Sequence, residues 1–148
     1  MRTWTRPLYD IEFGPPLYLM QYSPLVDLGQ AVAFISYLQR TDYWRQDVMP
    51  ENPSAPVRLE WAKTWPEMAG VRERRVRRVG KEFIITVGMG LLSAGFVIHE
   101  MSHVPVYRLS GHGDKYLKNW LTLWERNCRA SMFKAICDEL RRRGVTVP

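Results

Sequence analysis

Apolar residues recur three or four positions apart in three parts of the chain, which is the spacing of one face of an α-helix. The first part covers residues 23–44, where Ser23 and Pro24 supply an N-cap and a first-turn proline. The second covers residues 90–103, and the third covers residues 114–143, either continuous or interrupted. The pattern therefore predicts an early helix, a middle helix and a long C-terminal helical region.

Two further stretches have the patterns of β-strands. Residues 57–62 (V-R-L-E-W-A) alternate apolar and charged side chains, as a half-buried strand does. Residues 71–87 form a second β region, in which residues 83–87 (F-I-I-T-V) are the most apolar. This last strand either offers a free edge to an extended peptide or lies at the centre of the sheet. The pattern leaves both positions open.

The first 24 residues follow neither period. Prolines stand there at positions 7, 15, 16 and 24, among several aromatic residues. Such a composition predicts an irregular arm, with a short strand at residues 17–22. We expect the arm, residues 1–24, to pack on the rest of the protein or on a partner in an assembly.

The length of the chain and the order of its elements predict one small α+β domain. A chain of 148 residues fits a single domain, which we place at residues 25–148, after the arm. Its composition, 46% hydrophobic and 24% charged, is that of a globular protein and excludes a disordered chain. In this domain a helix and a short β-sheet precede the middle helix and the long C-terminal one.

No stretch of the sequence has the pattern of a membrane span. The longest mostly apolar stretch, residues 83–98, is interrupted by glycines and a serine and is too short to cross a bilayer. The N-terminus carries charged residues without an apolar core, which argues against a signal peptide. We therefore expect a cytoplasmic protein that does not engage a membrane.

The net charge of +6 comes largely from two arginine runs. The run at residues 141–143 precedes Gly144, and a helix C-terminus explains it, since cations and a left-handed glycine are both favoured there. The other run precedes the second β region and forms either a solvated ribbon or a contact for an anion or a nucleic acid. Its members are Arg72, Arg74, Arg75, Arg77 and Arg78.

All three histidines of the chain lie within residues 99–112, H-E-M-S-H-V-P-V-Y-R-L-S-G-H. Residues four apart share one face of a helix, so His99 and His103 can present two imidazoles to one metal ion. Glu100 points about 100° away from His99, so it can reach a water molecule beside the metal without being a ligand there. Pro105 should end the helix and push Val104 out of helical geometry.

A third ligand has to come from outside this helix. His112 stands in a Gly-His-Gly turn that can fold back over the helix end, which makes it the first candidate. Glu125 is the alternative, because glutamate also partners paired histidines in zinc sites. Asp114 either caps the next helix or orients an imidazole. These residues predict one zinc ion with an open fourth position, the arrangement of a zinc hydrolase.

The segment around the histidines resembles the zincin metallopeptidases. The residues that carry the resemblance are His99, Glu100, His103, His112 and Gly113. Within the zincins the chain is most similar to the SprT-like group and related small metallohydrolases of actinobacteria and their phages. In that group the H-E-x-x-H helix is followed by H-G-x-x-aromatic at the start of the next helix, and here H-G-D-K-Y stands at residues 112–116. The resemblance covers roughly residues 80–125 and implies a zincin-like fold.

Two departures limit what the resemblance implies. The loop between His103 and His112 is shorter than in SprT itself, and no four-cysteine zinc ribbon follows, so the DNA-linked role of SprT is not implied. The metzincin pattern fails, because Val106 and Leu109 stand where it has glycine and histidine.

We therefore expect a zinc-dependent metallopeptidase that acts on a peptide or a protein, with Glu100 as general base. The candidates for the oxyanion donor are Tyr107, Arg108 and Tyr116.

Two other functions stay open. One is a structural or interaction protein, such as a phage virion component, in which zinc only stabilises the fold. The other is a DNA-associated protease recruited through the arginine run. Glu100 favours the enzyme, since a structural zinc site has no use for a base.

Overall fold

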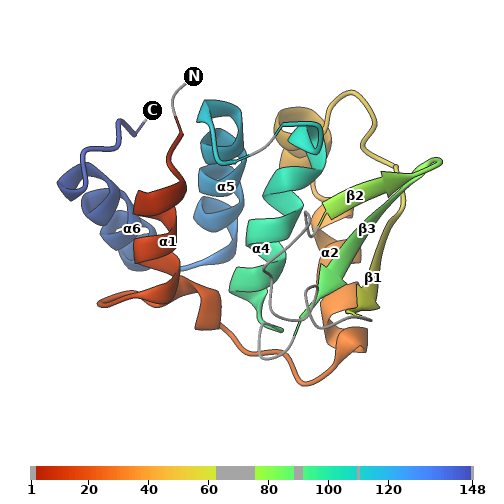
Figure 1. The fold of residues 1–148 in the computed structure, drawn as a ribbon, viewed down its shortest axis with the longest axis horizontal. Helices are drawn as coiled ribbons and strands as arrows, with labels where there is room; N and C mark the ends of the chain where they lie inside the picture. Colours follow the sequence, from red (N-terminus) through yellow and green to blue (C-terminus); the bar gives the residue numbers. More distant parts are fainter. Residues whose placement is uncertain (1–2, 63–75, 89–91, 110, 148) are drawn as a thin grey trace.

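The computed structural model describes residues 3–62, 76–88, 92–109 and 111–147. Its fold class is α+β, as the sequence predicts, with a three-stranded sheet at one end of a group of helices (Figure 1). In chain order the elements are α1 (Thr5–Phe13), the 3₁₀-helix η1 (Leu19–Gln21), α2 (Leu28–Arg40), the π-helix η2 (Trp44–Val48), β1 (Val57–Trp61), β2 (Val76–Val79), β3 (Glu82–Val87), α4 (Ala94–His103), the 3₁₀-helix η3 (Val104–Val106), α5 (Asp114–Asn127) and α6 (Ala130–Arg142).

β3 is the central strand of the sheet, whose order is β1-β3-β2. β1 runs parallel to it, with Val57 opposite Phe83, and β2 runs antiparallel to it, with Val76 opposite Ile85. All of β3 except Glu82 is buried, as the apolar run predicts. Because β3 is paired on both sides, the interpretation that it offers a free edge to a peptide is wrong.

The early helix is shorter than its apolar pattern. α2 begins after Asp27, whose carboxylate accepts a hydrogen bond from the backbone N–H three residues further on. The predicted cap lies outside the helix, because the Ser23 carbonyl accepts from the Ala94 N–H and Pro24 forms a β-bridge with Ser93. The chain before α2 is therefore held by the start of α4.

The C-terminal helical region is interrupted. Cys128 and Arg129 have extended backbone angles, so α5 ends at Asn127 and α6 starts at Ala130. Gly144 follows α6 with a φ of 81°, which confirms the predicted left-handed end of the chain's last helix.

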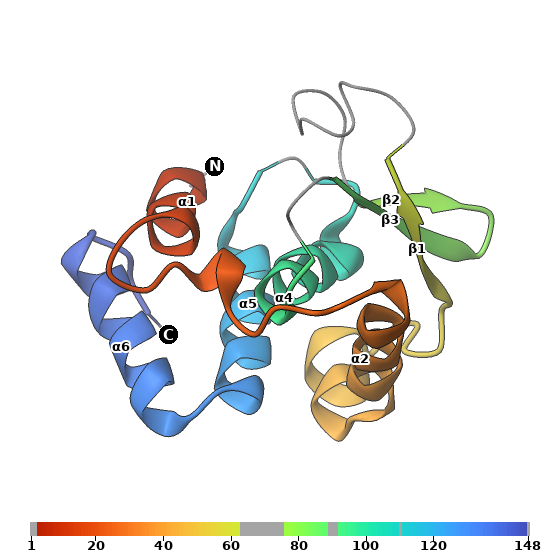
Figure 2. The same ribbon diagram turned by 90° about the horizontal axis from the view of Figure 1, so that it is seen from below.

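α4 lies in the middle of the molecule, where it packs against α5, α2 and η1 (Figures 1 and 2). Every residue from Ala94 to Ser102 is buried. The helix starts at Ser93, whose hydroxyl accepts from the Phe96 N–H and donates to the Met20 carbonyl. The start of the motif-bearing helix is thus fixed by side-chain and backbone groups of the core.

The end of α4 differs from the prediction in one respect. The α-helix does end at His103, but Val104 keeps helical angles (φ −55°, ψ −50°) and Pro105 continues the chain in a 3₁₀ turn. The clash with a following proline disfavours helical geometry without forbidding it. Burial of Val104, which is 1% exposed, holds the residue in place.

The N-terminal segment is not the irregular arm that its prolines predict. Residues 5–13 form α1, and η1 stands where a short strand was expected. Pro7 falls in the first turn of α1, where a missing N–H is tolerated. Leu8 and Ile11 are buried in the core, and α1 packs against α6 and η1 (Figure 2). Burial of the apolar face of α1 against the core therefore stabilises the helix in this segment.

Among the described residues, no helix is both long enough and apolar enough to cross a membrane.

Gly95 marks the closest approach of α4 to η1. A Cβ at this position would fall well inside contact distance of the Leu19 carbonyl oxygen, which is backbone and cannot rotate away. We expect Gly95→Ala to lower the free energy of unfolding by about 3 kcal/mol, measured by chemical denaturation. Gly80→Ala is the control, since a Cβ there meets no atom within 4 Å and only its φ of 62° costs about 1 kcal/mol. Equal effects of the two substitutions would contradict the close approach.

Candidate metal centre

The structure brings the three histidines together at the junction of α4 and α5. His99 and His103 lie one turn apart on α4, with ring centroids 5.2 Å from each other. Gly111, with a φ of 81°, turns the chain back so that the ring of His112 lies 5.1 Å from that of His99 and 4.8 Å from that of His103. One nitrogen from each ring lies within 4.8 Å of the others. This cluster can hold a metal ion, as the motif predicts.

The distance between two of the ring nitrogens fits a shared ion. Nε2 of His99 and Nε2 of His112 are 3.4 Å apart. Two nitrogen ligands at about 2.05 Å from a tetrahedral ion are themselves about 3.3 Å apart. The two imidazoles therefore already have the spacing of neighbouring ligands.

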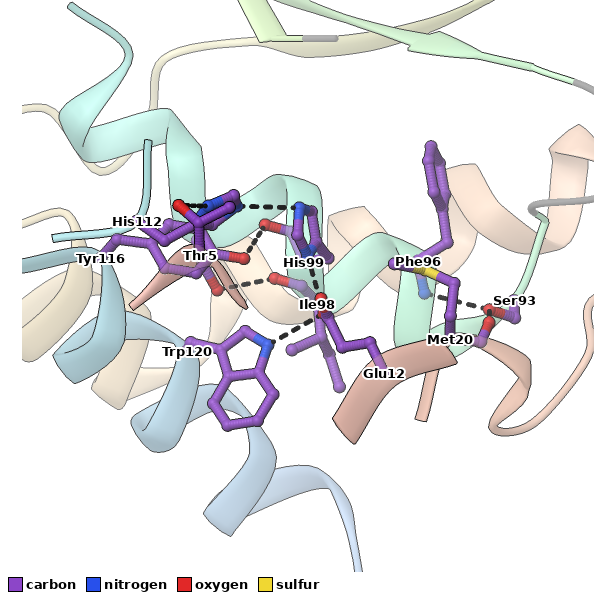
Figure 3. A network of polar contacts seen from close by, with 11 residues as sticks. Thr5, Glu12, Met20, Ser93, Phe96, Ile98, His99, His112, Tyr116 and Trp120 are labelled. Carbon is purple, nitrogen blue, oxygen red and sulfur yellow. Dashed lines mark hydrogen bonds and ion pairs between the residues drawn. The ribbon is translucent and has the colours of Figure 1, made fainter. Parts of the chain in front are cut away.

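The outer nitrogens of the same two imidazoles have partners on α1, which Figure 3 shows. The Glu12 carboxylate lies 2.6 Å from Nδ1 of His99, and the Thr5 hydroxyl lies 3.0 Å from Nδ1 of His112. A carboxylate can only accept, so Nδ1 of His99 carries the proton and its Nε2 carries a lone pair. If the Thr5 hydroxyl accepts from His112 in the same way, two lone pairs face each other across 3.4 Å, an arrangement that a cation between them would stabilise.

Burial favours the form of His112 that binds metals. The side chain is 4% exposed, and burial, together with the nearby His99, lowers the pKa of His112 to about 3. The pKa of His112 in the folded protein lies below the ordinary value of about 6.5, so folding favours the neutral ring. The stability of the fold that depends on this neutral ring is lost as the pH falls from about 6.5 towards about 3. The imidazole is thus a neutral ligand throughout the physiological range.

α1 supplies one side of the candidate site, which the sequence patterns did not predict. Thr5, Tyr9 and Glu12 are spaced so that they share one face of a helix, and this spacing is the signal that could have revealed them. The Tyr9 ring stacks on His99 with centroids 6.1 Å apart and meets His112 edge-on at 5.2 Å. The N-terminal segment is therefore part of the candidate site.

Glu100 follows His99 on α4 and is buried. It is 4% exposed, and its charge is among the causes that raise the pKa of Tyr116 well above the usual range, after burial and the charge of Glu12. The Tyr116 ring in turn lies 4.4 Å from that of His103 and 4.5 Å from that of His112. The carboxylate of Glu100 is thus near the histidines without being one of the three clustered ligands.

Tyr116 is bound to the backbone in this structure. Its hydroxyl donates to the carbonyl of His99 at 3.0 Å, which ties the start of α5 to α4. The other two candidate oxyanion donors, Tyr107 and Arg108, contact each other at 2.9 Å beyond η3, and Arg78 also donates to the Tyr107 hydroxyl. Hydrogen bonds from Arg78 and Arg108 lower the pKa of Tyr107.

Asp114 does not cap α5. The N-cap is Gly113, and Asp114 is the first residue of the helix, where an acidic side chain is favoured by the helix dipole. Its carboxylate accepts a hydrogen bond from the indole N–H of Trp4 at 2.8 Å. The backbone N–H of Trp4 donates to the His112 carbonyl at 2.7 Å. Asp114 therefore fixes the chain before α1 to the loop that carries His112.

Glu125 stands apart from the cluster. It is exposed near the end of α5, and the metal-ligand group found among the described residues contains only the three histidines. His112, and not Glu125, is the third residue that the structure places beside the motif.

Two of the five arginines in the run before the second β region, for which a solvated ribbon and an anion contact were both open, are held within the protein. Arg77 pairs with Glu60 at 2.6 Å, and Arg78 lies over the rings of Phe83 and Tyr107. The other three, Arg72, Arg74 and Arg75, lie outside the described residues.

Comparisons with protein-family models, with curated proteins and with solved structures give no match for this chain.

Metal binding should depend on the three imidazoles. We expect the protein to bind one divalent transition-metal ion and to melt at a lower temperature after chelation. If a binding free energy of roughly 10 kcal/mol is shared by three ligands, His112→Ala should weaken affinity about 200-fold in calorimetric titration. Glu125→Ala, on the exposed face of α5, is the control and should bind like wild type. The reverse result would make Glu125 the third ligand.

The Glu12 carboxylate should strengthen the metal–His99 bond. We expect Glu12→Gln to lower metal affinity by about 10- to 100-fold, because the amide keeps the hydrogen bond but not the charge. Without metal, the variant should unfold at the same temperature or higher, since a buried charge is gone. Asp10→Asn, an exposed carboxylate on the same helix, is the matched control. Equal affinities of both variants would remove Glu12 from the site.

Proposed function

We propose that the protein is a zinc-dependent metallohydrolase that cleaves peptide bonds. The observation that carries the proposal is the convergence of three imidazole nitrogens within 4.8 Å of one another, with a buried glutamate beside them. The H-E-x-x-H spacing on α4 and the resemblance to the SprT-like zincins support the same activity.

The donor set suits zinc. His99, His103 and His112 offer three neutral nitrogen ligands, the number that catalytic zinc sites take from the protein while one position stays open. Zinc bound in this way lowers the pKa of a water molecule to about 7 and polarises a carbonyl group. His103 is the only one of the three that is partly exposed.

Glu100 handles the proton in this proposal. Its position, one residue after a ligand, places its carboxylate to the side of the ligand face, where it accepts a proton from the attacking water and delivers it to the leaving amine. Burial of the side chain keeps bulk water from competing for this proton. Glu12 and Thr5 hold two imidazoles in the tautomer that the reaction needs.

A protein in which the metal only stabilises the fold would have a closed, four-ligand site. The described residues supply three ligands and a neighbouring carboxylate instead, which supports hydrolysis over a purely structural role.

Glu100→Gln separates these two functions. Glutamine keeps the size of the side chain and is not one of the three ligands, so zinc content and melting temperature should stay nearly unchanged. Loss of a positioned base should lower the hydrolysis rate by about 10²–10⁴-fold. The measurement is cleavage of a proteome-derived peptide library, with the new ends sequenced by mass spectrometry and zinc determined in the same samples.

The outcomes are distinct. If wild type and Glu100→Gln give the same products, Glu100 is not the base. If both bind zinc and neither yields any product, the metal stabilises the fold and the proposal of a peptidase fails.

A further inference from the structure

Two exposed aromatic side chains lie together on α1 next to the candidate metal centre. Tyr9 is 42% exposed and Phe13 is 52% exposed. Their rings meet edge-on with centroids 5.8 Å apart. Single exposed apolar residues need no explanation, but a contacting pair at the edge of a site leaves an apolar surface that a ligand can cover.

This pair, which we call the aromatic wall, is continuous with the histidines. Tyr9 stacks on His99 and also touches His112, and Phe13 lies one helical turn beyond Tyr9. The inner edge of the wall is therefore at the imidazoles, and its outer edge extends away from them along α1. A group attached to an atom held at the metal centre is therefore within reach of the wall.

The wall suits an apolar group. The neighbouring carboxylate on α1, Asp10, is paired with Arg143 at 3.3 Å, so its charge is already compensated. An aromatic ring packs on other aromatic rings edge-on or offset and gains attraction beyond that of the area buried.

From this placement we infer that the aromatic wall of Tyr9 and Phe13 binds a large apolar side chain of the substrate, aromatic or branched aliphatic, next to the carbonyl group that is attacked. The inference rests on the proposed function, since it names the substrate class of the same site. It makes residues of α1, and not of α4 or of the loop that carries His112, the determinants of specificity.

Two hydroxamates test the wall without requiring any turnover. Acetohydroxamate chelates zinc with a methyl group only, and 3-phenylpropanohydroxamate adds a phenyl ring on a short chain. We expect the zinc-loaded wild type to bind the phenyl compound about tenfold more tightly than acetohydroxamate in calorimetric titration. This affinity ratio should fall towards one in Phe13→Ala and in Tyr9→Ala.

Two further variants sharpen the result. Tyr9→Phe keeps the ring and should keep the ratio, which separates the ring from its hydroxyl. Tyr37→Ala removes an equally exposed aromatic residue on α2, where it stacks on Phe34, and should leave the ratio at the wild-type value.

The possible failures are distinguishable. If zinc and acetohydroxamate bind but the phenyl group adds nothing, or if Phe13→Ala and Tyr37→Ala behave alike, the wall has no role in binding and the metallohydrolase proposal stands. If zinc-loaded protein binds neither hydroxamate, no position is open at the metal, and the proposed function fails together with this inference.

Discussion

The contact between the Glu12 carboxylate and His99 is the interaction on which the rest of the site depends. Both side chains are buried, at 1% and 5% exposure, and 2.6 Å separates their polar atoms. Removing a carboxylate from water costs several kcal/mol unless it is paired. Here the imidazole N–H and the Trp120 indole N–H both donate to Oε2, while Oε1 has no hydrogen-bond partner among the described residues. A cation on the far side of the imidazole would offset the remaining cost. The buried charge of Glu12 would in turn strengthen the binding of that cation.

The same contact explains why α1, α4 and α5 meet at one point. Glu12 comes from α1, His99 from α4 and Trp120 from α5. Tyr116 adds a second link between α5 and α4 through the His99 carbonyl, and Trp4 links the chain before α1 to the His112 loop. α4 has little freedom to adjust, because Gly95 lies directly against the backbone of η1. Ring positions are therefore set by packing at several points, as a preorganised site requires.

The sequence predicted what depends on neighbours in the chain. The H-E-x-x-H helix, the strand from Phe83 to Val87 and the turn that returns His112 follow from spacing, apolar runs and glycines. The prediction failed where contacts between residues distant in the chain determine the local structure. The prolines of the first 24 residues masked a helix whose stability comes from burying Leu8 and Ile11 in the core. The position of Asp114 predicts a helix cap or an imidazole partner, but its carboxylate accepts from the indole N–H of Trp4.

The three ligands and their outer partners differ greatly in separation along the chain. His99, His103 and His112 fall within one short segment, whereas the contact of Glu12 with His99 spans 87 residues. A short segment can close around an ion at a small entropic cost, while the partners on α1 arrive only when a long loop closes. A metal ion at this site would therefore be held in two stages. The histidine segment alone would give a weak complex, and docking of the N-terminal helix would tighten it, so the strength of metal binding would report whether the two ends of the fold have met.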